Sequence, residues 1–424
     1  MPRLLAANVL EDILYRKQRF ERSFSLQLHQ RLLDTRDKSF AFNLVLTTLR
    51  RLGQIDDLIG SCLNRPLPRK AAGARTILRL GVAQLFFLDV PAHAAVNTSV
   101  DLANKRKQGP YKKLINAVLR RLNREGKMLV GEQDSAKLNT AEWLWDSWVA
   151  AFGHQICRKI AEAHLCQAPL DLTVKNDATT WTQKLSGQLL NTGSIRLFKY
   201  GDVETLFGYE EGAWWVQDTA AALPVKLLGE INGLRIADLC AAPGGKTAQL
   251  AAGGAEVIAI DRSVDRLNRL KQNLDRLNLT VKTVVADAIL WRPKYLLDAV
   301  LIDAPCTATG TIRRHPDIQY LKNPDHVTSG LVVQTALLQA ASEMVKPGGV
   351  VLYTTCSLQP EEGPSIIKAF IGSEAAVSRY PISASELAGM EEFLTSDGDL
   401  RTFPCFLAEH GGMDGFYAAR LVHD

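Results

Sequence analysis

Two cysteines, Cys306 and Cys356, each follow closely after a run of apolar residues of the kind that forms a buried strand. The two segments read AVLIDAPCTATG and VVLYTTCSLQPEEG, so polar turn residues come directly after each thiol. A lone cysteine at a strand end is an ordinary core residue. Two cysteines of this kind, each beside proline or threonine and a turn, indicate thiols that serve in an active site.

A pair of thiols suits methyl transfer to carbon 5 of a pyrimidine, which is a poor nucleophile. A thiolate that adds to carbon 6 makes carbon 5 electron-rich enough to attack a methyl sulfonium. An acid near the ring assists this addition, and Asp303 lies three residues before Cys306. A base must then remove the carbon-5 proton so that the thiol can leave. The residues alone leave open whether Cys306 or Cys356 attacks.

A glycine-containing loop, LCAAPGGKTAQL, follows an earlier apolar run and opens a helical segment. A phosphate-binding P-loop would need glycine where this chain has Cys240, and the dinucleotide pattern GxGxxG is also absent. Acids end the next two apolar runs. Asp261 is placed to hold ribose hydroxyls and Asp287 to reach an adenine ring. This pattern favours a nucleoside cofactor without phosphates, and S-adenosylmethionine fits it.

The elements that carry these residues alternate between strand and helix from about residue 230 onward. Such alternation predicts a parallel sheet in a doubly wound, Rossmann-like α/β domain, which we place at 226–424. Ligands of these sheets lie beyond the carboxyl ends of the strands, which is where both thiols and all three acids fall. The final segment, GFYAARLV, is strand-like and could add an edge to the sheet.

The rest of the chain has two further patterns. Residues 1–130 repeat apolar residues at three- and four-residue spacing and predict an all-α domain. The polar stretch at 123–140 could be a linker. Residues 140–225 mix a helical start with short apolar runs and predict a small α+β module.

Charge is distributed unevenly along the chain. Residues 1–130 hold 24 Lys and Arg against 10 Asp and Glu, a net of +14, whereas the whole chain carries only +5. A basic domain joined to an acidic one indicates a polyanionic partner, RNA or DNA.

Composition excludes several other classes. The seven cysteines form no CxxC pair, which argues against a disulfide framework and a cysteine zinc site, and we expect no metal. No apolar run is long enough to span a membrane, and the first twenty residues have the pattern of an amphipathic helix and not of a targeting peptide. We therefore expect a cytoplasmic protein with no membrane partner, most simply a monomer. Four cysteines are expected to be inert: Cys62, Cys157, Cys166 and Cys405.

The segments DLCAAPGGKT, DAPCTATGTIRRHPD and TTCSLQPEE together resemble the RsmB/Sun family of RNA 5-methylcytosine methyltransferases. The basic helical region resembles the NusB-like domain of the RsmB branch, and VQDTAA, at 216–221, matches the family's entry to its cofactor domain. The resemblance covers nearly the whole chain, strongly over 216–363 and more loosely over 130–215. The family pattern often has asparagine where this chain has Gly363.

The resemblance implies a role for each site residue. Cys356 would attack and Cys306 would aid release, whereas DNA cytosine methyltransferases attack with the cysteine that follows proline. Asp303 and Lys246 would complete the catalytic set. Cofactor contacts would come from these residues: Cys240, Ala241, Ala242, Pro243, Gly244, Gly245, Lys246, Asp261, Arg266, Asp287 and Asp303. The implied substrate is a cytosine of small-subunit (16S) ribosomal RNA.

Other functions make different demands on the sequence. A non-catalytic RNA-binding assembly factor would carry a damaged motif, and none is seen. A DNA methyltransferase would need a large target-recognition insert, which the α/β stretch is too compact to hold. Methyl transfer to another RNA, such as tRNA, also fits the residues.

Several other residues near these motifs carry expectations of their own. Arg313, Arg314 and His315 follow Cys306 closely and could contact phosphate. The tryptophan pair Trp214–Trp215 is expected in the core, with base stacking as the alternative. Asp218 is placed to cap the helix that follows it.

Overall fold

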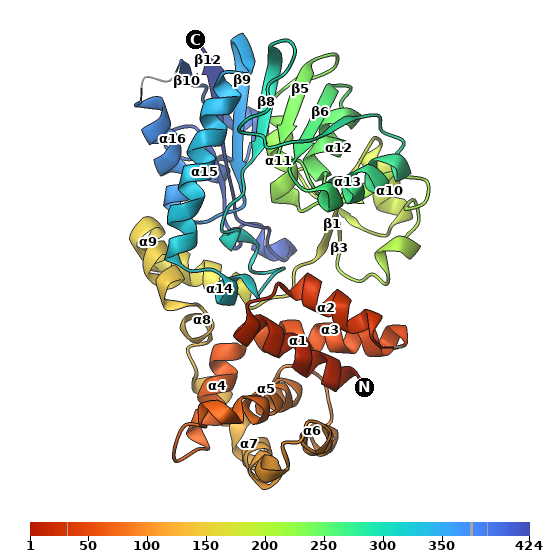
Figure 1. Cartoon of the computed structure of the whole chain (residues 1–424), viewed down its shortest axis with the longest axis vertical. Helices are drawn as coiled ribbons and strands as arrows, with labels where there is room; N and C mark the ends of the chain where they lie inside the picture. The colour runs from red at the N-terminus through yellow and green to blue at the C-terminus, as the bar shows by residue number, and fades with distance from the viewer. Residues whose placement is uncertain (32, 374–375, 388) are drawn as a thin grey trace. The chain divides into compact units, whose positions relative to one another are not determined.

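The computed structural model describes all residues except 32, 374–375 and 388 (Figure 1). The chain forms two compact units. The first comprises 1–166 together with 312–323, and the second comprises 167–311 together with 324–424. These boundaries differ from the three expected regions, because the helix expected to open the middle module belongs to the first unit.

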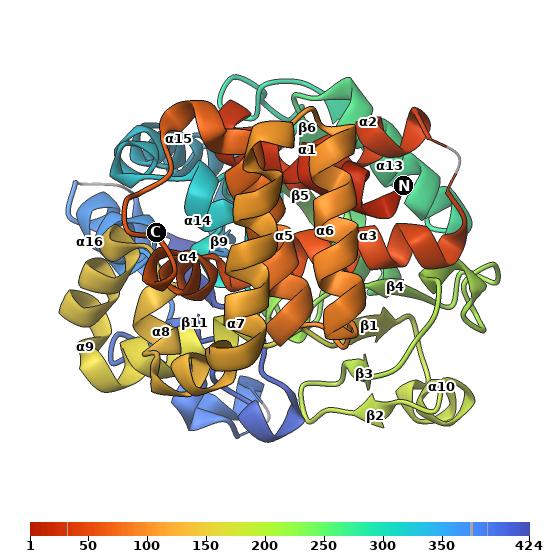
Figure 2. The ribbon, with the colours of Figure 1, turned by 90° about the horizontal axis from the view of Figure 1, so that it is seen from below.

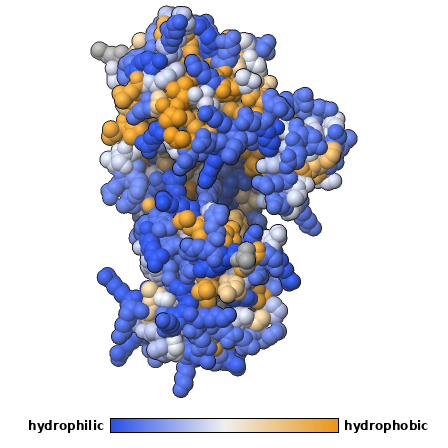
Figure 3. All heavy atoms as spheres, turned by 45° about the vertical axis from the view of Figure 1, so that its right-hand side comes forward, coloured by the Kyte–Doolittle hydropathy of each residue, from blue (hydrophilic) through white to orange (hydrophobic). Residues whose placement is uncertain are grey.

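The first unit is all-α. Its helices are α1 Pro2–Arg16, α2 Phe20–His29, α3 Thr35–Arg50, α4 Leu52–Ser61, α5 Ala72–Phe86, α6 Ala92–Lys105, α7 Lys112–Glu132, α8 Ser135–Leu138, α9 Glu142–His164 and α14 Ile318–Leu321. In Figure 2 α5, α6 and α7 run side by side, and their apolar faces share one core with α1, α3 and α4. The face of this unit that Figure 3 shows is mostly hydrophilic, with some hydrophobic patches.

The polar stretch expected as a linker is helical. The helix α7 continues to Glu132, and α8 follows after a break of two residues. The expectation of a linker is wrong because a polar stretch can also be the exposed side of a helix. Most of these residues form the solvated face of an amphipathic helix. Gly126 lies on the buried face, where an added Cβ would clash with the ring of Phe86.

A segment far along the sequence, 312–323, belongs to this helical unit. Two hydrogen bonds hold it there: Arg50 donates to the carbonyl of Arg313 at 3.0 Å, and the side-chain carboxylate of Asp317 accepts from the backbone N–H of Phe20 at 3.0 Å. Arg313 is fully buried. The expectation that it contacts phosphate is therefore wrong, since a guanidinium enclosed by protein does not reach RNA from this position.

The second unit begins with a small antiparallel sheet in the order β2-β3-β1-β4. Its strands are β1 Leu170–Val174, β2 Gln188–Leu189, β3 Ile195–Leu197 and β4 Trp214–Val216, with helix α10 Ala178–Lys184 beside them. Trp214 and Trp215 are buried, as expected, and so do not form a stacking platform. The side chain of Asp218 accepts from the N–H of Ala220 and so caps α11 Thr219–Lys226, which confirms the expected helix cap.

The main sheet has the strand order β10-β12-β9-β8-β5-β6-β7, with β11 paired to β12. Its strands are β5 Arg235–Leu239, β6 Glu256–Asp261, β7 Lys282–Val285, β8 Leu297–Asp303, β9 Val345–Thr355, β10 Val377–Arg379, β11 Leu400–Thr402 and β12 Phe416–His423. The strands β5 to β9 run parallel, whereas β12 is antiparallel to β9. The terminal strand is not an edge, because β10 and β11 pair with its outer side.

Helices cover both faces of the sheet. The helices α15 Pro324–Ser342 and α16 Pro364–Ile371 share one core with it, whereas α11, α12 Gly245–Ala252 and α13 Val264–Arg276 pack in two clusters on the other face (Figure 1). This confirms the expected Rossmann-like α/β fold, which follows the all-α domain in the sequence. Strand order reverses between β5 and β8, so the ligand crevice of such a sheet is expected at their carboxyl ends. Among the described helices, none is both long and apolar enough to cross a membrane.

Candidate active site

The structure brings the two strand-end cysteines together. Asp303 pairs with Thr354 in the register of β8 and β9, so both strands end at the same rim. The Sγ atoms of Cys306 and Cys356 lie 3.6 Å apart, and both side chains are half-buried. Two thiols at this separation can act on adjacent atoms of one small ring.

The surroundings of Cys306 disfavour its thiolate form. The hydrogen bond to Cys356, burial, and the nearby charges of Cys356 and Glu362 raise the pKa of Cys306 well above its ordinary value. The Cys306 thiol therefore keeps its proton at neutral pH. A protonated thiol does not attack carbon, so Cys306 is poorly suited to be the initial nucleophile.

A buried carboxylate that the sequence did not single out joins the two cysteine loops. Glu362 accepts from the N–H and hydroxyl of Thr307, which follows Cys306, and from the hydroxyl of Ser357 at 2.6 Å, which follows Cys356. Gln334 donates to it at 3.1 Å. Glu362 is fully buried, whereas its neighbour Glu361 is exposed. Glu362 thus fixes the backbone on which each thiol is carried.

Lys246 and Asp303 form an ion pair at the same rim. Their Nζ and Oδ2 atoms are 2.8 Å apart, and the Lys246 side chain is only 8% exposed. The ammonium also lies 4.8 Å from the ring centre of Phe416, a residue that the sequence did not point to. The hydroxyl of Thr354 donates to Asp303 at 3.3 Å. The carboxylate and the ammonium are therefore held in fixed positions beside the thiols' strand ends.

The glycine loop forms a tight turn at the end of β5. Cys240 and Gly244 both have positive φ, 63° and 104°, and a Cβ on Gly244 would lie 2.8 Å from Leu270. Burial, then the charges of Asp303, Asp261 and Asp238, raise the pKa of Cys240 to about 12. This third cysteine remains a neutral thiol and contributes shape to the loop, not a nucleophile.

The two acids expected to hold the cofactor lie in different environments. Asp261, at the end of β6, is buried, accepts from the N–H groups of Ala242 and Ser263, and pairs with Arg266 at 3.2 Å. Arg266 also donates to the carbonyl of Ala242. Asp287 is exposed and accepts from the N–H of Ile289 at 2.9 Å.

These residues fit a nucleoside cofactor better than a phosphate-bearing one. Three carboxylates, Asp261, Asp287 and Asp303, follow or end strands at one rim; Lys246 pairs with Asp303, and Arg266 pairs with Asp261. Carboxylates accept from ribose hydroxyls and an adenine amine but repel phosphate. Within the described residues, no group of three or more His, Cys, Asp and Glu side chains is arranged to hold a metal.

Beneath the loop lies a second carboxylate that the sequence did not indicate. Asp238 is fully buried in β5 and accepts from the hydroxyl of Thr247 at 2.6 Å. Burial raises its pKa to about 7, against the lowering effect of the Thr247 hydrogen bond.

Asp238 should make stability depend on pH. The folded protein retains this proton between about pH 4, the unfolded value, and about pH 7, so the free energy of unfolding falls as pH rises through that window, by up to ~1.4 kcal/mol per unit. We expect Asp238→Asn to lose this decline and to gain stability relative to the wild type towards pH 8. Urea unfolding from pH 4 to pH 8, with exposed Asp275→Asn as the control, measures it. Parallel curves for wild type and Asp238→Asn would contradict the assignment.

The fold and the site define a methyltransferase of the Rossmann-like class. Two family models match the chain: "16S rRNA methyltransferase RsmB/F" over residues 225–422 and "NusB family" over residues 1–124. The chain is 34% identical to ribosomal RNA small subunit methyltransferase B of Pseudomonas putida, covering 99% of this chain and 98% of the relative. It is also 34% identical to the protein of the same name from Vibrio vulnificus, with 99% of each covered.

Two solved structures share the fold. The crystal structure of PH0851 superposes with a TM-score of 0.76 at 22% identity, covering 99% of this chain and 98% of that one. NSun6 from Pyrococcus horikoshii, solved with SFG, gives a TM-score of 0.56 at 21% identity, covering 67% of this chain and 98% of that one. The chain belongs to the RsmB/F family of 16S ribosomal RNA methyltransferases, with a NusB-family domain at its N-terminus. It is an enzyme that methylates ribosomal RNA.

Proposed function

We propose that this protein transfers a methyl group from S-adenosylmethionine to carbon 5 of a cytosine in small-subunit ribosomal RNA, through a covalent adduct on Cys356. The observation that carries the proposal is the pair of thiols 3.6 Å apart, of which Cys306 has the raised pKa. Addition to carbon 6 and removal of the proton on carbon 5 need two groups at about this separation.

The cofactor site would use the rim of β5, β6 and β7. Asp261 accepts from the ribose hydroxyls, Asp287 from the adenine amine, and the loop 240–246 provides backbone for close approach. Arg266 orients Asp261 through their ion pair. When bound, S-adenosylmethionine supplies an electrophilic methyl group to the crevice.

Addition comes first in this scheme. The Cys356 thiolate forms a bond to carbon 6, and the electron pair of the carbon 5–carbon 6 double bond moves to carbon 5. Carbon 5 would then bond to the methyl group as the bond from that methyl group to the cofactor's sulfur breaks, and S-adenosylhomocysteine would leave. Asp303 accepts from the exocyclic amine of cytosine, and Lys246 donates to the ring and stabilises its added charge.

Release uses Cys306. Once Cys356 is a neutral thioether, neither its hydrogen bond nor its charge raises the pKa of Cys306 any longer. Cys306 then gives its proton to solvent and removes the proton from carbon 5. The electron pair of that bond restores the double bond and expels Cys356 as a thiolate. Cys306 ends as a thiol, so one proton is produced per methyl group transferred.

The RNA would be held by charge and by unstacking of the target. The domain at 1–130 carries +14, which suits a polyanion. A cytosine that is already unpaired costs little to turn into the crevice. We place this reaction in the cytoplasm, on a monomeric enzyme.

Nucleoside analysis tests the proposal. Undermodified 16S ribosomal RNA and, separately, tRNA are incubated with the protein and methyl-labelled S-adenosylmethionine, digested and separated by mass. The proposal predicts labelled 5-methylcytidine from the ribosomal RNA. Label in a different nucleoside, or in tRNA alone, would contradict the proposed reaction or substrate, and RNA binding without label would favour an assembly factor.

A further inference from the structure

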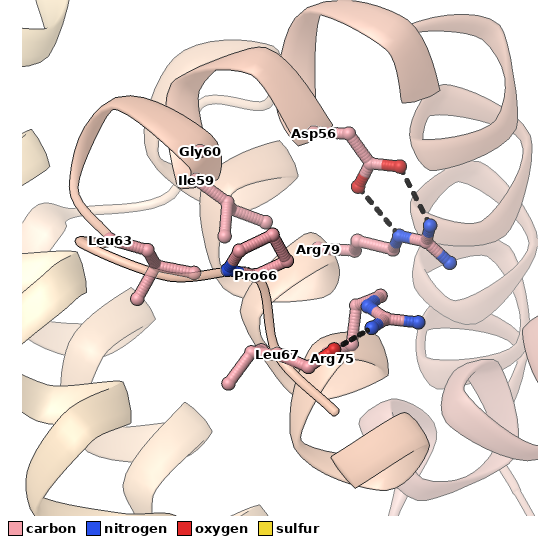
Figure 4. A pocket seen from close by; sticks show the side chains of 8 residues that line it. All are labelled: Asp56, Ile59, Gly60, Leu63, Pro66, Leu67, Arg75 and Arg79. Atoms are coloured by element: carbon pink, nitrogen blue, oxygen red, sulfur yellow. Dashed lines mark hydrogen bonds and ion pairs between the residues drawn. The ribbon is translucent and has the colours of Figure 1, made fainter. Parts of the chain in front are cut away.

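The helical unit contains a pocket remote in sequence from every motif used above. It has a volume of about 350 Å³, within the range of small-molecule sites, and is shown in Figure 4. Its lining comes from α4, the loop after α4, and α5: Asp56, Ile59, Gly60, Leu63, Pro66, Leu67, Arg75 and Arg79. We propose that this pocket binds one unstacked nucleotide of the RNA, with a base that carries an exocyclic amine.

One side of the pocket is a fixed ion pair. Arg79 donates to both carboxylate oxygens of Asp56, at 2.7 and 2.6 Å, as Figure 4 shows. The Arg79 side chain is 11% exposed and that of Asp56 41%. Burial lowers the pKa of Arg79, but the bonds to Asp56 outweigh burial and raise it, so the pair stays charged. The outer lone pairs of Asp56 remain open to a donor, such as a base amine.

The remaining walls supply an apolar surface and a cation. Ile59, Leu63, Pro66 and Leu67 present hydrocarbon against which a base can lie flat. Arg75 uses one N–H on the carbonyl of Leu67, at 2.6 Å. A guanidinium has five N–H donors, so most of those of Arg75 remain for a phosphate.

The surroundings select a nucleotide over other ligands. The loop beside the pocket carries three exposed cations, Arg65, Arg69 and Lys70. Within the described part of the chain, neither they nor Arg75 form an ion pair. This charge attracts polyanions, and the acceptor oxygens of Asp56 call for a donor, which the carboxylates of a purely acidic peptide do not supply. A nucleotide satisfies both features, since it joins an anionic phosphate to a base edge with donors.

The inference depends on the proposed function in one respect, that the substrate is RNA. The probe is guanosine 5′-monophosphate, because the active site is expected to take cytosine and adenosine. Saturation-transfer NMR on the full chain, without S-adenosylmethionine, detects binding. Inosine 5′-monophosphate, which lacks the 2-amino group, should bind about tenfold more weakly, the effect of one charged hydrogen bond.

Two glycines make matched variants. A Cβ on Gly60 or on Gly131 would meet no atom within 4 Å, and both lie in helices of the same unit, α4 and α7. Gly60→Phe places a ring in the pocket mouth and Gly131→Phe places one elsewhere. We expect Gly60→Phe to lose the transfer signal, Gly131→Phe to retain it, and Arg75→Gln to weaken binding of the phosphate.

Three results would overturn the inference. These are no transfer to guanosine monophosphate, equal transfer in Gly60→Phe and the wild type, or equal binding of the inosine nucleotide. A Gly60→Phe variant that binds nucleotide and RNA normally but loses a protein partner would assign the pocket to protein docking instead. Because the assay involves no catalysis, failure of cytosine methylation would leave its outcome readable.

Discussion

Cys306→Ser is expected to accumulate a covalent RNA–protein adduct, whereas Cys356→Ser forms none. The reason is the division of labour at the thiol pair, where Cys356 makes the bond to carbon 6 and Cys306 removes the carbon-5 proton that allows it to break. Each variant should lose methyl-transfer turnover by at least about a thousandfold, as is usual when a nucleophile or its proton acceptor is removed. Denaturing gels of protein incubated with S-adenosylmethionine and ribosomal RNA measure the adduct.

The controls for this pair are available in the same chain. Cys166→Ser alters an exposed cysteine of the helical unit and should behave as the wild type. An adduct that accumulates in Cys356→Ser and is absent from Cys306→Ser would reverse the two roles and assign attack to the cysteine that follows proline. Two adduct-free variants with normal turnover would exclude covalent catalysis.

Glu362→Gln is expected to slow turnover by about tenfold to a hundredfold, equivalent to the 1–3 kcal/mol of a buried polar group that loses partners. The amide replaces one acceptor oxygen with a donor. It therefore faces the N–H of Thr307 and the hydroxyls of Thr307 and Ser357 with the wrong polarity on one side. The loops that carry the two thiols should loosen, while cofactor affinity should stay unchanged.

A purely structural role for Glu362 would leave the pH profile in place, so this profile is the decisive readout. The pKa of Cys306 is raised by its hydrogen bond to Cys356, by burial, and also by the charge of Glu362. Removing that charge stabilises the thiolate, so the pH at which adduct release becomes fast should move downward. Glu361→Gln, which alters the exposed neighbour, is the control. An unshifted profile with wild-type turnover in Glu362→Gln would refute the positioning role.

The sequence predicted the arrangement of strand ends because a simple rule governs it. Parallel strands in a doubly wound sheet end at one edge, so residues that follow apolar runs are neighbours even when the chain separates them by fifty positions. The rule therefore places four residues at one rim from their sequence positions alone: Cys306, Cys356, Asp261 and Asp303. The buried tryptophan pair and the Asp218 cap follow from equally local chemistry.

Other features depend on long-range contacts that no local pattern encodes. The motif PEE contains two adjacent glutamates, and only the fold turns Glu362 inward and Glu361 to solvent. Arginine is a residue type that often contacts RNA, yet Arg313 is fully buried and its segment belongs to the helical unit. Asp238 lies inside a strand segment with no pattern that marks it, and its raised pKa comes from burial under the loop.

The most direct test of carbon-5 chemistry uses ribosomal RNA transcribed with cytidine tritiated at carbon 5. Methylation there must expel the tritium to water, one atom for each methyl group gained. The account predicts release that requires S-adenosylmethionine, matches methyl incorporation one for one, and is absent in Cys356→Ser. Methyl incorporation without tritium release would place the methyl group on another atom and contradict the proposed chemistry of the thiol pair.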